Sequence, residues 1–394
     1  MFASRTDWPL TPNRLARAME ERRKAGLPIL DLTESNPTRC GFNFQAEKVL
    51  GSLADPRSLA YEPDPRGLLP ARRAVAAYYA ERGIQLSPEQ IVLTTSTSEA
   101  YSFLFRLLAN SGEAILAPRP SYPLFEFLAR LNDLELVPYP LSYHDGWQFD
   151  LQAIQEILQR ARPRVRAVIV VHPNNPTGSF VSRDELRALV ASCREHGLAL
   201  IADEVFADYA FEADARRVVS HAGVCEVLTF TLSGLSKISG LPQMKLAWIA
   251  ATGPEELLQP ALARLEIIAD TYLSVSAPLA HALPEMLQTR RSAQPQILER
   301  VQANLRWLDA QLARDLPVTR LKTEGGWYAV LRLPAVQGDE DWALDLLTED
   351  GVFVHPGHFY DFVEEGHLVV SLLPPLEIFQ RGISRLLMRV RRAG

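Results

Sequence analysis

Short apolar runs alternate with amphipathic stretches between about residues 70 and 270 of the chain. Segments such as 101–109 and 183–196 repeat their apolar residues with the period of a helix. The apolar runs have the length and composition of buried strands, and they cover 91–94, 114–117, 134–137, 167–171, 199–202, 227–230 and 246–249. This alternation predicts an α/β fold, in which helices cover both faces of a mostly parallel sheet.

The pattern changes near residues 275–285, although no linker composition marks the place. Helical periodicity over 284–312 comes before a strand pattern that starts at Gly326. A helix near 341–347, a strand over 368–372 and a last helix that ends in basic residues follow. This order predicts a second, smaller α+β unit.

Composition narrows the class of protein. The 41 basic and 47 acidic residues give a net charge of −6, which argues against a nucleic-acid or anionic-membrane partner. Three scattered cysteines do not make a disulfide framework or a cysteine-based zinc site, which favours a reducing compartment. We find no run of about 20 apolar residues and no apolar signal segment at the start. We therefore expect a soluble, cytoplasmic protein.

Lysine is rare in this chain. Only five of the 41 basic residues are lysines, and the remaining 36 are arginines. A primary amine can lose its proton and attack a carbonyl, whereas a guanidinium stays charged. Each lysine is therefore a candidate for chemistry, above all Lys237, which lies among small and hydroxyl-bearing residues after the run 227–230.

Ligands of such folds bind beyond the carboxyl ends of the strands, where this chain places several polar residues. Ser96, Thr97 and Ser98 follow the run 91–94 and begin a helix. Ser96 and Glu99 have the spacing of a capping box, and the same helix start could bind a phosphate. The two interpretations are compatible.

Three further strand ends carry candidate groups, each with a structural alternative. Tyr122 could face a planar ligand or simply pack in its proline-rich loop. Asn175 could offer its amide or belong only to a turn. Asp203 follows the apolar run 199–202 directly, so its carboxylate is expected to be buried and to need a partner. It could cap the start of a helix, form an ion pair or pair with a protonated nitrogen of a ligand. Together with Lys237, these groups fit pyridoxal phosphate (PLP), which needs a lysine, an acid for its ring nitrogen and a phosphate cradle.

At this point the sequence resembles the class I/II, aspartate-aminotransferase-like enzymes of PLP fold type I over nearly its whole length. The motifs keep the family order. They are Tyr61 with Gly67-Leu-Leu-Pro-Ala-Arg, Ser96-Thr97-Ser98, Pro120-Ser-Tyr122-Pro, Asn175-Pro-Thr-Gly, Asp203-Glu-Val, Gly234-Leu-Ser-Lys237 and Gly325-Gly-Trp-Tyr. The resemblance implies a large PLP-binding domain over 46–279 and a small domain made of 1–45 and 280–394.

The resemblance also implies roles for single residues. Lys237 would form the Schiff base and shuttle protons, and Asp203 would hold the ring nitrogen protonated. The cofactor phosphate would be bound by Ser96, Thr97, Ser98 and Lys245, with Ser233 as a further candidate. Asn175 would bond the ring oxygen, and Tyr122 would stack on the ring. Tyr61 of a partner subunit would also reach the phosphate. A homodimer with shared active sites follows from that last contact.

Several positions depart from the family pattern. Phe206 stands where a tyrosine usually bonds the ring oxygen, and Lys245 replaces an arginine, which keeps the charge but loses the bidentate fork. Gln243 replaces a small residue, and Gly234 falls where many relatives carry a phosphate-binding serine.

The largest departure is Val369, at the position of the arginine that binds the substrate α-carboxylate. Candidates to replace that arginine are Ser35, Asn36 and Arg39, or His355 and His358. The histidines at 355, 358 and 367 also allow a metal site by spacing, but no carboxylate pattern supports one, so we expect no metal.

The sequence therefore predicts an aminotransferase that moves an amino group from an amino acid or amine to a 2-oxo acid. Because one fold hosts several reactions, a PLP-dependent carbon–sulfur lyase or decarboxylase stays open, as does a PLP-binding protein with degenerate activity. The family pattern begins within the first 30 or so residues, so we expect no DNA-binding domain before it.

Overall fold

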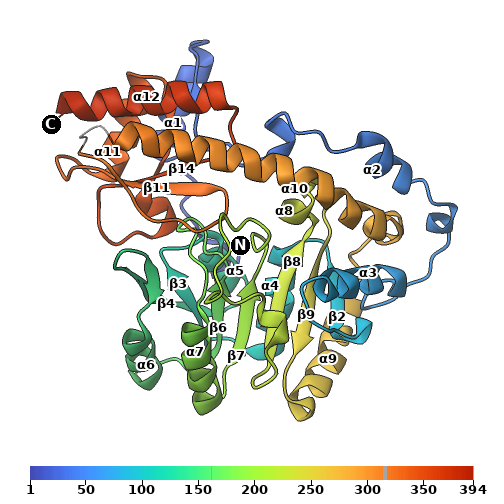
Figure 1. The fold of residues 1–394 in the computed structure, drawn as a ribbon. Helices are drawn as coiled ribbons and strands as arrows, with labels where there is room; N and C mark the ends of the chain where they lie inside the picture. Colours follow the sequence, from blue (N-terminus) through green and yellow to red (C-terminus); the bar gives the residue numbers. More distant parts are fainter. Residues whose placement is uncertain (161, 314–316, 394) are drawn as a thin grey trace.

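The computed structural model describes residues 1–160, 162–313 and 317–393, and its central feature is an eight-stranded sheet (Figure 1). The strands, in order across the sheet, are β2 (Ile91–Thr94), β9 (Ala247–Thr252), β8 (Thr229–Gly234), β7 (Ala199–Asp203), β6 (Val165–Val171), β3 (Ala114–Arg119), β4 (Glu135–Tyr143) and β5 (Trp147–Phe149). The strands from β8 to β4 run parallel, while β9 and β5 run antiparallel to their neighbours. The predicted fold class, with a mostly parallel sheet, is confirmed.

Helices cover both faces of this sheet. They are α3 (Leu69–Ala80), α4 (Thr97–Leu108), α5 (Leu124–Leu131), α6 (Leu151–Arg160), α7 (Arg183–His196) and α9 (Glu255–Asp270). Successive strand residues point to opposite faces. Ile249 therefore packs with α4, α5 and α9, whereas Trp248 packs with α3 on the other face. Helices α6 and α7 bury Ile154 and Leu189 farther along that second face.

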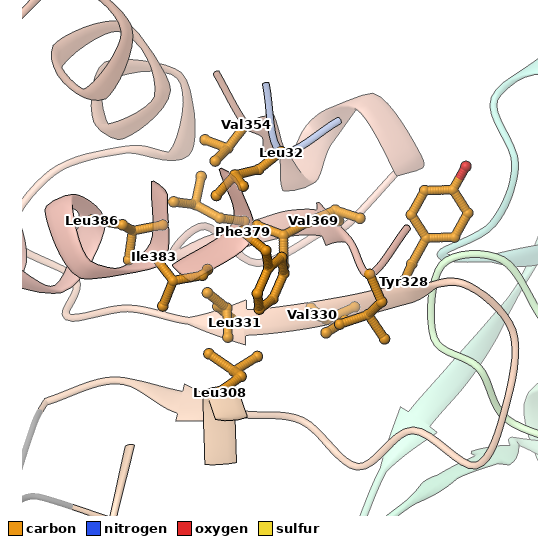
Figure 2. Close-up of a cluster of buried hydrophobic side chains, with 14 of the residues drawn as sticks. Leu32, Leu308, Tyr328, Val330, Leu331, Val354, Val369, Phe379, Ile383 and Leu386 are labelled. Atoms are coloured by element: carbon orange, nitrogen blue, oxygen red, sulfur yellow. The ribbon is translucent and has the colours of Figure 1, made fainter. Parts of the chain in front are cut away.

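The C-terminal part forms the smaller α+β unit that the sequence predicts. Its antiparallel sheet has the order β10 (Thr319–Arg320), β11 (Tyr328–Arg332), β14 (His367–Ser371) and β13 (His355–Pro356). From the N-terminal segment, β1 (Leu30–Asp31) pairs in parallel with β12 (Val352–Phe353). Its helices are α1 (Arg14–Lys24), α11 (Asp339–Thr348) and α12 (Leu376–Ala393). Figure 2 shows the core of this unit, in which Phe379 of α12 lies between Leu32 of the N-terminal segment and Leu331 of β11.

Helix α10 (Ala277–Leu312) connects the two parts and has 36 residues. It begins earlier than the predicted 284–312, because Ser276 is its N-cap and Pro278, in the first turn, is the proline that suits a helix start. Leu283 packs in the core of the large sheet and Leu308 in the core of the small one. Because one continuous helix belongs to both cores, the domain boundary between residues 279 and 280 stays a prediction. Neither α10 nor any other described helix is long and apolar enough to cross a membrane.

Two short α-helices remain to be described. Helix α2 (Ala46–Ser52) follows the N-terminal segment and packs against α10. Helix α8 (Leu235–Ile238) follows β8 directly and carries Lys237. At four residues, α8 is too short to be recognised from periodicity in the sequence.

Candidate active site

The carboxyl ends of β2, β3, β6, β7 and β8 meet at one edge of the large sheet, beside a cavity of about 290 Å³. Residues after each of these strands line it, and the small domain contributes Tyr328. Of the site residues predicted from the sequence, the structure brings together Ser35, Ser96, Thr97, Ser98, Tyr122, Asn175, Asp203, Lys237 and Lys245. Ser35 and Lys245, which are 210 positions apart in the chain, thus share one pocket.

The N-terminus of α4 opens into this cavity. Ser96 is the N-cap, and its hydroxyl oxygen accepts a hydrogen bond from the Glu99 backbone N–H at 3.1 Å. The capping box is only half formed, because the Glu99 carboxylate accepts from the N–H of Thr95 and from Ser274 instead of from Ser96. Neither bond uses the backbone N–H groups of Thr97 and Ser98 in the first turn, so these groups can still attract an anion.

Lys237 lies one turn after the end of β8. At the strand end, a Cβ on Gly234 would lie 2.8 Å from the Cβ of Ala247 and 2.9 Å from the Leu246 carbonyl oxygen, so a serine side chain does not fit there. The Lys237 amine lies 5.3 Å from the ring centre of Phe206 and 4.8 Å from that of Trp327. Burial lowers the pKa of Lys237 to about 8, and the charge of Asp203 acts in the opposite direction. The amine is therefore much easier to deprotonate than an exposed lysine.

Asp203 is the last residue of β7 and is buried. One carboxylate oxygen accepts from the Tyr101 hydroxyl and the other from the Val205 N–H, each at 3.1 Å. Burial outweighs these bonds and raises the pKa of Asp203 to about 6. A carboxylate in this state gains from a cationic partner in the cavity, such as a protonated ring nitrogen.

Asn175 provides the clearest sign of an unfilled contact. Its side-chain oxygen is buried and has no hydrogen-bond partner among the described residues. An amide oxygen and nitrogen are assigned by their partners, so this group can turn either atom toward a ligand. Phe206, also on the cavity wall, brings no hydroxyl. Tyr122 lines the same cavity and is 42% exposed.

Some predicted site residues lie away from the cavity. Ser233 is the next-to-last residue of β8, but its side chain is buried and donates to the Glu204 carbonyl at 3.4 Å instead of lining the cavity. Asn36 caps a short 3-10 helix, and the mostly exposed Arg39 side chain lies 3.9 Å from Glu34. Of the three substrate candidates in this segment, only Ser35 lines the cavity.

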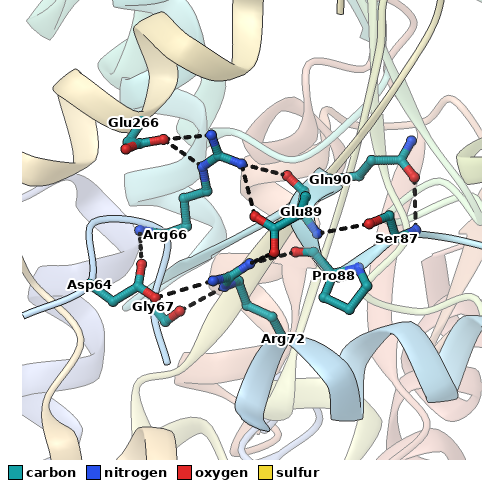
Figure 3. Close-up of polar contacts among 9 residues, drawn as sticks. All are labelled: Asp64, Arg66, Gly67, Arg72, Ser87, Pro88, Glu89, Gln90 and Glu266. Carbon is teal, nitrogen blue, oxygen red and sulfur yellow. Dashed lines mark hydrogen bonds and ion pairs between the residues drawn. The ribbon is translucent and has the colours of Figure 1, made fainter. Parts of the chain in front are cut away.

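Tyr61 is 83% exposed and does not reach the cavity of its own chain. The loop behind it is fixed by a polar cluster (Figure 3), in which the buried Arg72 donates to the Gly67 carbonyl and pairs with Asp64 and Glu89. Arg66 extends the cluster through ion pairs with Glu89 and Glu266. The exposed tyrosine is therefore carried by a well-anchored loop.

Sequence analysis missed three residues of the site. Ser236, next to Lys237, lines the cavity where Ser233 does not. Tyr328, which lies in the Gly325-Gly-Trp-Tyr motif, lines the cavity together with Ser35. Tyr101 lies on the face of α4 that meets Asp203. Neighbourhood in the sequence could have suggested Ser236, but only the packing of α4 against β7 reveals Tyr101.

Two of the three C-terminal histidines, His355 and His367, contact different groups. The His355 ring nitrogen lies 3.2 Å from the Tyr360 hydroxyl, while His367 stacks on Phe362 and bonds to the Glu364 carbonyl. Across the described ranges, no group of three or more histidine, cysteine or acidic residues is arranged to hold a metal ion.

Val369 pairs with Val330 and His355, on the same face of the small sheet as Tyr328.

Comparison with known proteins decides the family. The model of the family "Aminotransferase class I and II" matches residues 29–378, which is most of the chain. The chain belongs to this family. The enzymes of the family depend on PLP, so the protein is a PLP-dependent aminotransferase, as the sequence predicts.

Relatives and solved structures agree with this membership. The glutamate-pyruvate aminotransferase AlaA of Escherichia coli is 27% identical over 384 residues, with 94% of this chain and 91% of that protein covered. The S-alkyl-thiohydroximate lyase SUR1 of Arabidopsis thaliana is 29% identical over 325 residues, with 79% of this chain and 68% of that protein covered. The structure of the alanine aminotransferase of Pyrococcus furiosus has a TM-score of 0.89 at 21% identity, covers both chains fully and supports the fold.

Proposed function

We propose that this aminotransferase moves an amino group from an α-amino acid to a 2-oxo acid, with Lys237 as the reacting lysine. The observation that carries the proposal is the placement of the Lys237 amine in one cavity with the acid Asp203, the unpartnered amide oxygen of Asn175 and the start of α4. An amine, an acid, an amide and an anion site are the groups that PLP requires.

The cavity residues fit PLP from end to end. The N-terminus of α4, with Ser96, Thr97 and Ser98, suits the phosphate, and Ser236 and Lys245 lie on the same cavity wall. Asp203 would face the ring nitrogen, Asn175 the ring oxygen and Tyr122 the ring face. Bound PLP supplies an aldehyde that reacts with amines and a protonated ring that withdraws electrons.

Lys237 is proposed to carry protons during the reaction. Once its amine is free, it can take the proton from the substrate Cα as a general base and give a proton back as a general acid. Such a base works best when its pKa lies near the working pH, and burial brings Lys237 close to that range. The aromatic rings of Phe206 and Trp327 lie beside the amine and form an apolar side of its surroundings.

The pH dependence of cofactor binding should report the lowered pKa of Lys237. Only the unprotonated amine attacks an aldehyde, so the rate at which the cofactor-free protein reacts with PLP should rise with pH, with a midpoint near 8. The rate of visible-band formation measures this, and free N-acetyl-lysine amide serves as the reference for an exposed amine. A midpoint for the protein near that of the reference would contradict the buried environment of Lys237.

We also propose a homodimer in which Tyr61 of each subunit reaches the other subunit's phosphate site. The support is the exposure of Tyr61 and of its neighbour Leu59, 93% exposed, on a loop anchored by Arg72. Large exposed apolar side chains on a rigid loop are typical of an interface. A cytoplasmic location fits the buried free thiols of Cys40 and Cys193.

Glutamate and alanine are the first substrates to consider, because AlaA of E. coli is named for glutamate and pyruvate, and pyruvate is the 2-oxo acid of alanine. A second candidate is carbon–sulfur bond cleavage, favoured by the similarity to SUR1 and by Val369 on the small-sheet face that Tyr328 shares. Without a guanidinium at that position, the α-carboxylate needs another partner, and an amine substrate without a carboxylate is also compatible.

Spectra of the PLP-loaded protein separate these functions. We expect L-alanine or L-glutamate to convert the visible band to that of the aminated cofactor, and pyruvate or 2-oxoglutarate to restore it. Cystathionine in place of the amino acid tests the second candidate through release of thiol, pyruvate and ammonia. If cystathionine released thiol while no amino acid or amine converted the visible band to that of the aminated cofactor, transamination would be rejected in favour of the lyase reaction.

A further inference from the structure

We propose that Tyr209 and Trp327 are positioning residues that hold Lys237 at its two ends, so that the small domain sets where the reacting amine lies. The proposal rests on the proposed role of Lys237. It starts from the Tyr209 hydroxyl, which donates to the Lys237 backbone carbonyl at 2.6 Å. Tyr209 is fully buried, so water does not compete for this bond.

The tyrosine bond does more than satisfy the carbonyl. The Lys237 oxygen already accepts from the Gly240 backbone N–H at 3.2 Å, as expected at the end of a short helix. The additional, short bond from a stiff aromatic side chain fixes the orientation of α8 about its axis. Gln294 supports the next residue in the same way, through a bond of 2.9 Å to the Ile238 carbonyl.

Trp327 acts at the other end of the lysine. Its ring centre lies 4.8 Å from the Lys237 amine, a distance at which a cation is attracted to the ring face. The rings of Tyr209 and Trp327 pack edge to face with centres 5.1 Å apart. The groups that contact the two ends of Lys237 are therefore in direct contact with each other.

This pair joins the two domains. Tyr209 lies six residues after Asp203 at the end of β7, whereas Trp327 directly precedes β11 of the small sheet. The backbones are also tied, because the Gly326 N–H donates to the Tyr209 carbonyl and Ala210 forms a bridge with Gly325. A shift of β11 relative to the large sheet must therefore move Trp327 and Tyr209 together, and with them the surroundings of the amine.

The chain offers a matched control. The Tyr139 hydroxyl donates to the Ile169 carbonyl at 2.8 Å, and Tyr139 is fully buried in a cluster beneath the large sheet. Tyr209→Phe and Tyr139→Phe each remove one buried bond from a tyrosine to a carbonyl. Both variants should lower the melting temperature by a similar amount, but only Tyr209→Phe loosens Lys237.

The test follows the band formed when PLP is added to the full-length, cofactor-free protein, together with the kinetics of the loaded enzyme. For Tyr209→Phe we expect about tenfold slower band formation and an equal fall in kcat with KM within about twofold, since a small misplacement of a reacting group is costly. Trp327→Leu should behave likewise, and Trp327→Phe should lose less because it keeps a ring. The double variant Tyr209→Phe/Trp327→Leu should lose no more than the worse single one, because the two residues act as a unit.

Two results would overturn the proposal. If Tyr209→Phe and Tyr139→Phe formed the band at equal rates, the Tyr209 bond would be purely structural. If the losses in kcat of the two single variants multiplied in the double variant, Tyr209 and Trp327 would act independently. Failure of the unsubstituted protein to form the band at all would instead reject the role of Lys237. The two kinds of failure are thus distinguishable.

Discussion

Replacement of Lys237 by alanine should abolish the visible band with PLP and slow amino transfer by about 10³-fold or more. The physical reason is the loss of the amine that bonds the cofactor and carries the proton, and a positioned base alone contributes about 10²–10⁴-fold. Absorbance spectra and single-turnover conversion of L-alanine measure the two effects. The fold should survive, because the amine makes only ring contacts with Phe206 and Trp327 among the described residues.

Two further variants sharpen this experiment. Lys237→Arg keeps the positive charge but cannot lose its proton at neutral pH, so it should be as inactive as the alanine variant. Lys24→Ala removes an exposed lysine that pairs with Glu20 on α1, and it should behave like the unsubstituted protein. A Lys237→Ala protein that keeps the band and the half-reaction would show that another amine does the chemistry.

Replacement of Asp203 by asparagine should lower kcat by about 10²–10³-fold, the usual effect of removing one charged or oriented group from a buried site. Asparagine has nearly the same shape but carries no charge to hold a ring nitrogen protonated. The visible band should still form, because Lys237 is unchanged. Single-turnover rates and the band position measure the loss, and Asp214→Asn at an exposed ion pair with Arg216 is the control.

The same variant should stabilise the cofactor-free protein at neutral pH. Burial raises the pKa of Asp203 to about 6 from 3.8, so the folded state binds its proton more tightly than the unfolded state does. The ionised carboxylate therefore costs stability, and this loss develops as the pH rises from about 4 to 6 and persists above it. Asparagine avoids the loss, and a higher melting temperature at pH 7 with lower activity is the expected outcome. A lower melting temperature would show that the carboxylate is needed for folding.

The strand positions were predictable because buried parallel strands are continuous apolar runs. The run 91–94 matches β2, and 167–171 lies within β6. The run 227–230 starts too early, since β8 begins at Thr229 and continues to Gly234 through hydroxyl-bearing residues. Short strands such as β10 and β13 lack any such signal, because two residues have no periodicity to detect.

The sequence also exposed much of the candidate site, since polar residues that directly follow apolar runs stand out. Asp203 and Asn175 were found in this way, and Lys237 through the rarity of lysine. Which of the two serines, Ser233 or Ser236, lines the cavity could not be predicted in the same way. It depends on which side of the chain faces the cavity where β8 turns into α8, and this orientation is visible only in the folded chain.

By itself, then, the sequence determined the fold class, the order of the elements and the residue types at the strand ends, because hydrophobic period and motif order are local properties of the chain. Only the tertiary structure decided which groups act on one another. The bond from Tyr101 to Asp203 and the contacts of Tyr209 and Trp327 with Lys237 join segments about 30 to 100 residues apart. Such contacts arise from the packing of whole helices and strands, which no short stretch of sequence encodes.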